Sequence, residues 1–134
     1  MNSAGIQRPL AVMMRSLAQT ISPDATVRDA ARQMRLTKAG ALLVREGAGY
    51  LGIVSEADLV RKVLAESLVP AQTLVRSVMS APLITIDIGA SAHDASEIMA
   101  RAGIRHLAVV EGGEVVGMLS VRDLLRYFKN WGPQ

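Results

Sequence analysis

The sequence predicts an α+β fold made of two copies of one β-α-β-β-α unit. A shift of 65 positions aligns residues 14–61 with residues 79–126 without a gap, and 16 of the 48 pairs are identical. The same order of apolar runs, helix caps and turns recurs in both copies. Two copies are too few for a solenoid, which needs three or more. We therefore expect them to pack about a pseudo-twofold axis and to bury apolar faces that neither buries alone.

Each copy opens with a short strand and a capped helix. The strands are expected at 19–22 and 84–87. Thr26 with Asp29, and Ser91 with Asp94, have the spacing of a capping box, which marks a helix start. Apolar residues then recur at helical spacing. They are Val27, Ala30, Ala31 and Met34 in copy one, and Ala95, Ile98, Met99 and Ala102 in copy two.

A hairpin and a second helix complete each copy. Strands 41–44 and 50–54 are joined through residues 46–49, and strands 107–110 and 115–119 through Gly112-Gly113, a tight-turn pair. The second helices are expected at 56–67 and 121–129, with one helical turn within 73–79. Repeat one therefore spans 10–68 and repeat two 73–129, and residues 1–9 and 130–134 are terminal extensions.

Composition excludes several classes of protein. The chain has no cysteine, so disulfides and thiolate metal sites are ruled out. It has 15 basic and 12 acidic residues without a basic block, so a nucleic-acid partner is not expected, although the pI of 9.8 keeps a nucleic-acid-associated regulator as the weakest alternative. No apolar run reaches the roughly 20 residues of a membrane span, and no secretory signal is evident. We expect a cytoplasmic protein without membrane contact.

The junction between the hairpin and the second helix carries the most informative motif. It reads Gly-Ile-Val-Ser-Glu-Ala-Asp-Leu over 52–59 and Gly-Met-Leu-Ser-Val-Arg-Asp-Leu over 117–124. Ser-x-x-Asp is first of all a helix cap, and we expect capping at Ser55 and Ser120 as at Thr26 and Ser91. A helix that starts directly from a strand also offers N–H groups and a hydroxyl to a phosphate. The Asp one turn later is a natural acceptor for ribose hydroxyls.

The doubled unit with this motif resembles the CBS domain, whose tandem pair is called a Bateman module. Three further segments support the resemblance: Ser77-Val78-Met79, residues 40–44 and residues 103–110. The resemblance covers about residues 10–129. It implies a regulatory module for signal transduction that binds an adenine nucleotide, with AMP, ADP or ATP as the expected ligand and NAD or S-adenosylmethionine as alternatives.

The resemblance also implies two clefts, each formed by the first-strand region of one copy and the Ser-x-x-Asp of the other. Arg105 and His106 stand where related proteins place a phosphate-facing basic group. Copy one has Gly40 and Ala41 at these positions, so the clefts are not expected to be equivalent. Copy one also has Ala57 where copy two keeps Arg122, which argues against polyphosphate binding in the Asp58 cleft. One cleft would combine Thr20, Ile21, Ala25 and Ala41 with Ser120 and Asp123; the other would combine Thr85, Ile86, Ala90, Ile104, Arg105 and His106 with Ser55 and Asp58.

No nucleophile, base and orienting group stand at a recognisable spacing, so we expect no catalysis and no required cofactor. Neither histidine has an acidic pair at ligand spacing, so no metal site is expected. The leading function is an adenine-nucleotide sensor acting on an unknown effector protein. The alternative is a ligand-free dimerisation or interaction module. Apolar residues of the second helices predict a homodimer: Leu59, Val60, Val63, Leu64, Leu124, Leu125 and Phe128.

Overall fold

The computed structural model describes residues 9–131 and divides into two compact units. The first-repeat unit is Gln19–Ile84, and the second-repeat unit combines Met1–Ala18 with Thr85–Gln134. Each unit holds one three-stranded sheet and its own helices, so the predicted α+β class is confirmed. No helix within the described residues is long and apolar enough to cross a membrane.

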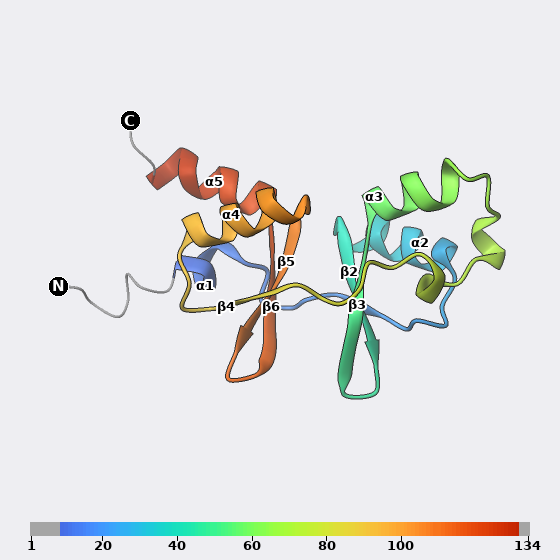
Figure 1. The fold of residues 1–134 in the computed structure, drawn as a ribbon, viewed down its shortest axis with the longest axis horizontal. Coiled ribbons are helices and arrows are strands. Elements are labelled where there is room, and N and C mark those ends of the chain that lie inside the picture. Colours follow the sequence, from blue (N-terminus) through green and yellow to red (C-terminus); the bar gives the residue numbers. More distant parts are fainter. Residues whose placement is uncertain (1–8, 132–134) are drawn as a thin grey trace. The chain divides into compact units, whose positions relative to one another are not determined.

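The first-repeat unit contains a sheet in the order β1-β2-β3, with β1 (Thr20–Ile21) parallel to β2 (Ala41–Glu46) and β2 antiparallel to β3 (Gly49–Ser55). Helix α2 (Val27–Thr37) connects β1 to β2, and α3 (Glu56–Leu59) follows β3 directly (Figure 1). The π-helical segment η2 (Val60–Leu64) continues α3. The linker, residues 65–84, connects η2 to the next strand and contains two short 3₁₀ turns, η3 (Pro70–Gln72) and η4 (Val75–Ser77).

The second-repeat unit repeats this order. Its sheet is β4-β5-β6, with β4 (Thr85–Asp87) parallel to β5 (His106–Glu111) and β5 antiparallel to β6 (Glu114–Ser120). Helix α4 (Ala92–Ala102) joins β4 to β5, and α5 (Val121–Trp131) follows β6. A short helix, α1 (Pro9–Met13), belongs to the same unit.

The local signals for helix starts and turns are confirmed. Thr26 and Ser91 form full capping boxes with Asp29 and Asp94. Gly112 and Gly113 have φ values of 59° and 84°, the left-handed pair that a two-residue hairpin turn between Glu111 and Glu114 requires.

The second helix of copy one differs from the predicted helix over 56–67. Its α-helical part ends at Leu59, and Val60–Leu64 is π-helical, with the Ala65 N–H donating to Val60 O at 2.9 Å, five residues back. The π-helical turn is wider than an α-helical one, and two adjacent residues within it, Lys62 and Val63, contact the rest of the unit. Val63 is buried, and the Lys62 ammonium donates to Val78 O in the linker. The equivalent helix α5 is regular, so the repeat alone did not predict the π-helical turn.

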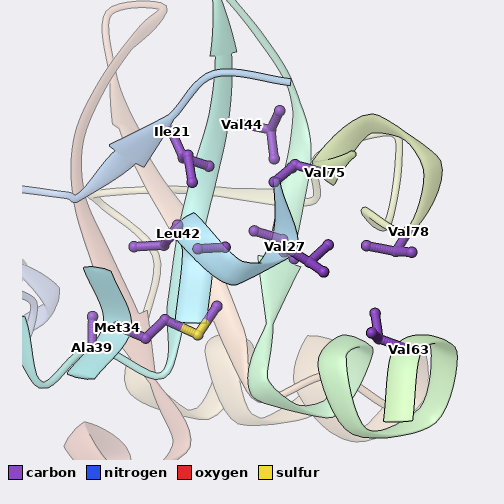
Figure 2. Close-up of a cluster of buried hydrophobic side chains, with 11 residues drawn as sticks. Ile21, Val27, Met34, Ala39, Leu42, Val44, Val63, Val75 and Val78 are labelled. Carbon is purple, nitrogen blue, oxygen red and sulfur yellow. The ribbon is translucent and has the colours of Figure 1, made fainter. Parts of the chain in front are cut away.

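Each unit has an aliphatic core. The core of the first-repeat unit includes residues that precede the first strand of repeat two in the sequence, and the core of the second-repeat unit includes a residue that precedes the first strand of repeat one. Figure 2 shows Val75 and Val78 of the linker beside Val27, Val44 and Val63 in the first-repeat core. In the second-repeat unit, Leu10 of α1 packs with Ile86, Leu107 and Leu119, among others. Leu10 and Val75 stand 65 positions apart and are both fully buried. The lead segments, residues 10–15 and 75–80, are thus exchanged between the repeats.

Backbone pairing fastens each lead segment to a hairpin strand. Ile53 and Ser80 exchange two hydrogen bonds, at 2.9 and 2.8 Å, and Arg15 and Met118 do the same at 2.9 and 3.0 Å. The preceding glycine of each motif makes this approach sterically feasible. A Cβ on Gly52 would overlap Ser80 O, and one on Gly117 would lie 2.7 Å from Arg15 O. The glycine of the motif therefore serves packing.

Arg76 adds a polar tie between the linker and the first-repeat sheet. Its guanidinium donates to Asp24 Oδ1 at 2.8 Å and to Glu46 Oε2 at 3.3 Å, and its backbone N–H donates to Pro23 O. The hydrogen bond with the Asp24 carboxylate, more than any other contact, raises the pKa of Arg76 above its ordinary value.

Candidate functional site

The serine and aspartate of each motif bind one another at the strand-to-helix junction. In copy one the Ser55 N–H and Oγ donate to Asp58 Oδ2 at 2.9 and 3.1 Å, and the Asp58 N–H donates to Ser55 Oγ at 3.2 Å. In copy two the Ser120 N–H donates to Asp123 Oδ2 at 2.8 Å, and the Asp123 N–H to Ser120 Oγ at 3.2 Å. The predicted capping role is confirmed at both junctions.

The first helical turn offers fewer free N–H groups than expected. The Glu56 N–H donates to Gly40 O at 3.0 Å, and the Val121 N–H donates to Arg105 O at 2.9 Å, because the end of the second hairpin strand lies beside the start of the first. The N–H groups of Asp58 and Asp123 bind their cap hydroxyls. The expectation of several free donors for a phosphate is therefore wrong.

The second carboxylate oxygen distinguishes the two copies. Asp58 Oδ1 accepts from Ser80 Oγ at 3.0 Å and pairs with Lys62 Nζ at 2.9 Å, and Asp58 is 6% exposed. Among the described residues, Asp123 Oδ1 has only Arg126 Nη1 near it, at 3.9 Å, and the Arg126 side chain is 69% exposed. The Asp58 carboxylate is thus enclosed by donors from its own unit, whereas Asp123 keeps an acceptor that no described group binds closely.

Sequence reasoning missed Lys62 and Ser80 as partners of Asp58. The spacing of Asp58 and Lys62 is i,i+4, a signal for a helical ion pair that the sequence does contain. Ser80 gives no such signal, because it reaches Asp58 only when its lead segment pairs with β3.

The remaining predicted site residues divide between the units, and their combination across the repeats stays a prediction. Ala41 is the register partner of Ser55, and His106 is the partner of Ser120, so both pairs lie at the strand end where the second helix begins. Arg105 is exposed beside this junction in the second-repeat unit. The first-repeat unit holds Thr20, Ile21, Ala25, Ala41, Ser55 and Asp58; the second-repeat unit holds Thr85, Ile86, Ala90, Ile104, Arg105, His106, Ser120 and Asp123.

Ile21 and Ile86 offer little side-chain surface to an adenine base. They are 8% and 5% exposed, and each packs into the core of its own unit. Their neighbours Thr20, half-buried, and Thr85, exposed, lie on the other face of the strand. Any base contact at the isoleucines is therefore expected through the backbone or through these threonines.

No group of three or more His, Asp or Glu residues that could hold a metal ion occurs in the described part of the chain. His93 is exposed in the first turn of α4, and its ring lies 5.2 Å from the ring of Phe128, tilted by 48°. This contact joins α4 to α5 within the second-repeat unit.

Comparison with known proteins identifies the class. The CBS domain model matches residues 10–65 and 75–130, and the chain therefore belongs to the CBS-domain family as a pair of CBS domains. Among its relatives, the CBS domain-containing protein YhcV of Bacillus subtilis is 32% identical over 83% of this chain and 79% of its own. CBSCBSPB2 of Arabidopsis thaliana is 36% identical over 89% of this chain and 22% of its own length.

Solved structures agree on the fold. A protein with CBS domains from Burkholderia ambifaria MC40-6, for which a role in signal transduction has been proposed, has a TM-score of 0.84 and 29% identity, covering 89% of this chain and 88% of its own. The hexameric CBS-CP12 protein from bloom-forming cyanobacteria has a TM-score of 0.81 and 30% identity, covering 92% and 73%. The chain spans 22% to 56% of the length of the first three curated relatives that it matches.

Proposed function

We propose that the chain is a regulatory module that binds an adenine nucleotide as a signal and performs no catalysis. The observation that carries this proposal is the Asp123 carboxylate. One of its oxygens is fixed by the Ser120 cap, while the other has no donor closer than 3.9 Å among the described residues. A carboxylate held rigidly in this way suits a pair of ribose hydroxyls, since charge-assisted hydrogen bonds to it are short and strong.

The surroundings of Asp123 support a phosphate-bearing ligand. Arg105 and Arg122 are exposed. The resemblance assigned Arg105 to the Asp58 cleft, but its carbonyl accepts from the Val121 N–H, so it also lies at the start of α5, the helix that carries Asp123. Guanidinium groups bind phosphates with two parallel hydrogen bonds and stay charged at any physiological pH. Copy one has Gly40 and Ala57 at these two positions, so it lacks both cations. The ribose and phosphate of a nucleotide would thus find their partners around Asp123.

The proposed output is a shift in population. A ligand that binds one arrangement of the two repeats better than another favours that arrangement, and an effector protein would respond to it. AMP, ADP and ATP are the first ligands to test, followed by NAD and S-adenosylmethionine. A thermal-shift screen followed by calorimetry provides the test. Ligand at 100 times its Kd adds about 2.7 kcal/mol to the free energy of unfolding.

GMP and ribose 5-phosphate serve as matched controls for the base and the phosphate. We expect the adenine nucleotide to raise the melting temperature more than either, and Asp123→Ala to abolish the difference. Equal shifts from every phosphate compound, fading with added salt, would instead indicate generic attraction to a basic surface and would refute the proposal.

A ligand-free dimerisation module is the second candidate, and one observation favours it. Val60, Leu64 and Leu125 on the second helices are 55%, 66% and 65% exposed, which is apolar surface that a homodimer would cover. Val63 and Leu124, which we expected to share this surface, are 2% and 4% exposed and belong to the cores instead. A stable dimer that responds to no nucleotide would favour this candidate.

A further inference from the structure

We propose that the ammonium of Lys62 closes the copy-one motif, so that Asp58 fastens the linker and the chain has a single nucleotide site, at Asp123. This inference rests on the proposed function, because it selects between the two junctions that the repeat predicts. Lys62 then determines which junction takes a ligand.

The Asp58 carboxylate is saturated with donors from its own unit. Oδ2 accepts from the Ser55 N–H and Oγ, and Oδ1 accepts from Ser80 Oγ and pairs with Lys62 Nζ. A carboxylate has about four lone-pair positions, and here four donors take them. Ribose hydroxyls would therefore have to displace existing partners before they could bind.

The Lys62 ammonium is held from the other side as well. It donates to Val78 O at 2.9 Å and lies 3.4 Å from Ser80 Oγ, in addition to its 2.9 Å contact with Asp58 Oδ1. An ammonium has three protons, and three acceptors surround it. Two of these acceptors, Val78 O and Ser80 Oγ, lie in the lead segment. The Lys62 ammonium therefore connects the π-helical turn to the linker.

Copy two has none of these parts. A shift of 65 positions places Tyr127 at the position of Lys62 and Arg15 at the position of Ser80. Arg15 forms the equivalent backbone bridge, to Met118, so the lead segment itself is in place. Asp123 consequently keeps Oδ1 for another partner, with Arg126 Nη1 at 3.9 Å as its nearest described cation. The same motif is thus closed in one copy and open in the other.

The test is calorimetric titration with AMP of the wild type and four variants: Asp123→Ala, Asp58→Asn, Lys62→Met and Arg61→Met. The first two compare the junctions. Lys62→Met removes the ammonium and keeps an unbranched side chain, while Arg61→Met removes an adjacent exposed cation and is the matched control. Circular dichroism verifies that each variant is folded.

We expect the wild type to bind one AMP per chain, Asp123→Ala to bind at least tenfold more weakly, and Asp58→Asn to stay within about twofold, since a lost hydrogen bond to a charged group costs at least a factor of ten. Lys62→Met should gain a second, weaker binding event, because copy one has no counterpart of Arg105 and Arg122, and Arg61→Met should not. Two AMP per wild-type chain, or equal losses from Asp58→Asn and Asp123→Ala, would overturn this inference and leave the proposed function standing. One AMP per chain for Lys62→Met would also overturn it. Absence of AMP binding by every protein would overturn the inference, and absence of binding in further titrations with ADP, ATP, NAD and S-adenosylmethionine would overturn the proposed function as well.

Discussion

Replacement of the two motif aspartates should affect stability very unequally. Asp58→Ala removes an acceptor that four groups of its own unit share, among them Ser80 Oγ in the linker and Lys62 Nζ in the π-helical turn. Asp123→Ala removes an acceptor for the Ser120 N–H and one long ion pair. The two side chains occupy equivalent positions, so each is the control for the other.

The magnitude follows from the contacts. Both variants keep the serine N-cap and lose the reciprocal hydrogen bond of the capping box, from the serine N–H to the carboxylate, which is worth about 1 kcal/mol. Asp58→Ala also loses the hydrogen bond from the half-buried Ser80 hydroxyl to a charged group, worth about 1.5 kcal/mol. The Lys62 pair adds at most about 0.5–1 kcal/mol, because the lysine side chain is 44% exposed and solvent screens it. We expect about 3 kcal/mol for Asp58→Ala and about 1 kcal/mol for Asp123→Ala.

Urea denaturation followed by circular dichroism, without ligand, measures the difference. At equal m-values the midpoint of Asp58→Ala should fall well below that of Asp123→Ala, and a parallel thermal scan should separate them by roughly 4–8 °C. Equal destabilisation of the two variants would show that only the shared helix cap matters. The enclosure of Asp58 by the linker and Lys62 would then contribute nothing measurable.

Three further predictions follow from packing and exposure. Gly52→Ala and Gly117→Ala should each destabilise the protein by about 2 kcal/mol in urea denaturation, because the new Cβ meets lead-segment atoms. Gly49→Ala is the control and should stay within about 0.5 kcal/mol, since its Cβ meets nothing closer than 3.8 Å. An equal effect of all three variants would contradict the exchange of segments. Val75→Ala should cost about 2 kcal/mol, since the side chain is fully buried in the first-repeat core, and a neutral result would place the linker outside that core. Leu64→Glu should convert a dimer into a folded monomer in light scattering, whereas a monomeric wild type would refute the predicted homodimer.

Much of the fold was predictable because its signals are local. The caps at Thr26 and Ser91 and the Gly112-Gly113 turn depend on neighbours within three residues, and the structure has them where the sequence indicates. The exchange of lead segments was not predictable in this way. Leu10 and Val75 read as apolar residues before a strand, and nothing local distinguishes packing on the next repeat from packing on the other one.

The candidate site shows the same limit. The cap role of Asp58 and Asp123 follows from the Ser-x-x-Asp spacing, and the structure confirms it. The difference between them depends on Ser80, which lies 22 residues from Asp58 in sequence and 3.0 Å from it in space. The alignment of the copies does show that Lys62 corresponds to Tyr127 and that Ser80 corresponds to Arg15. The effect of this difference on Asp58 could not be predicted, because it depends on the β-bridge between Ile53 of β3 and Ser80 of the linker.

The exchanged lead segments also determine how the chain can be divided into fragments. A fragment cut at the repeat boundary, residues 10–68, would lack the buried Val75 and Val78 and would carry Leu10 without the core that covers it. Residues 19–84 form one continuous stretch that contains every core residue of its unit. The other unit is discontinuous, and residues 85–134 would need residues 9–18 supplied as a separate peptide to complete the core and pair with β6. The gene encodes two repeats in sequence, whereas the folded chain consists of one continuous unit inserted within a split one.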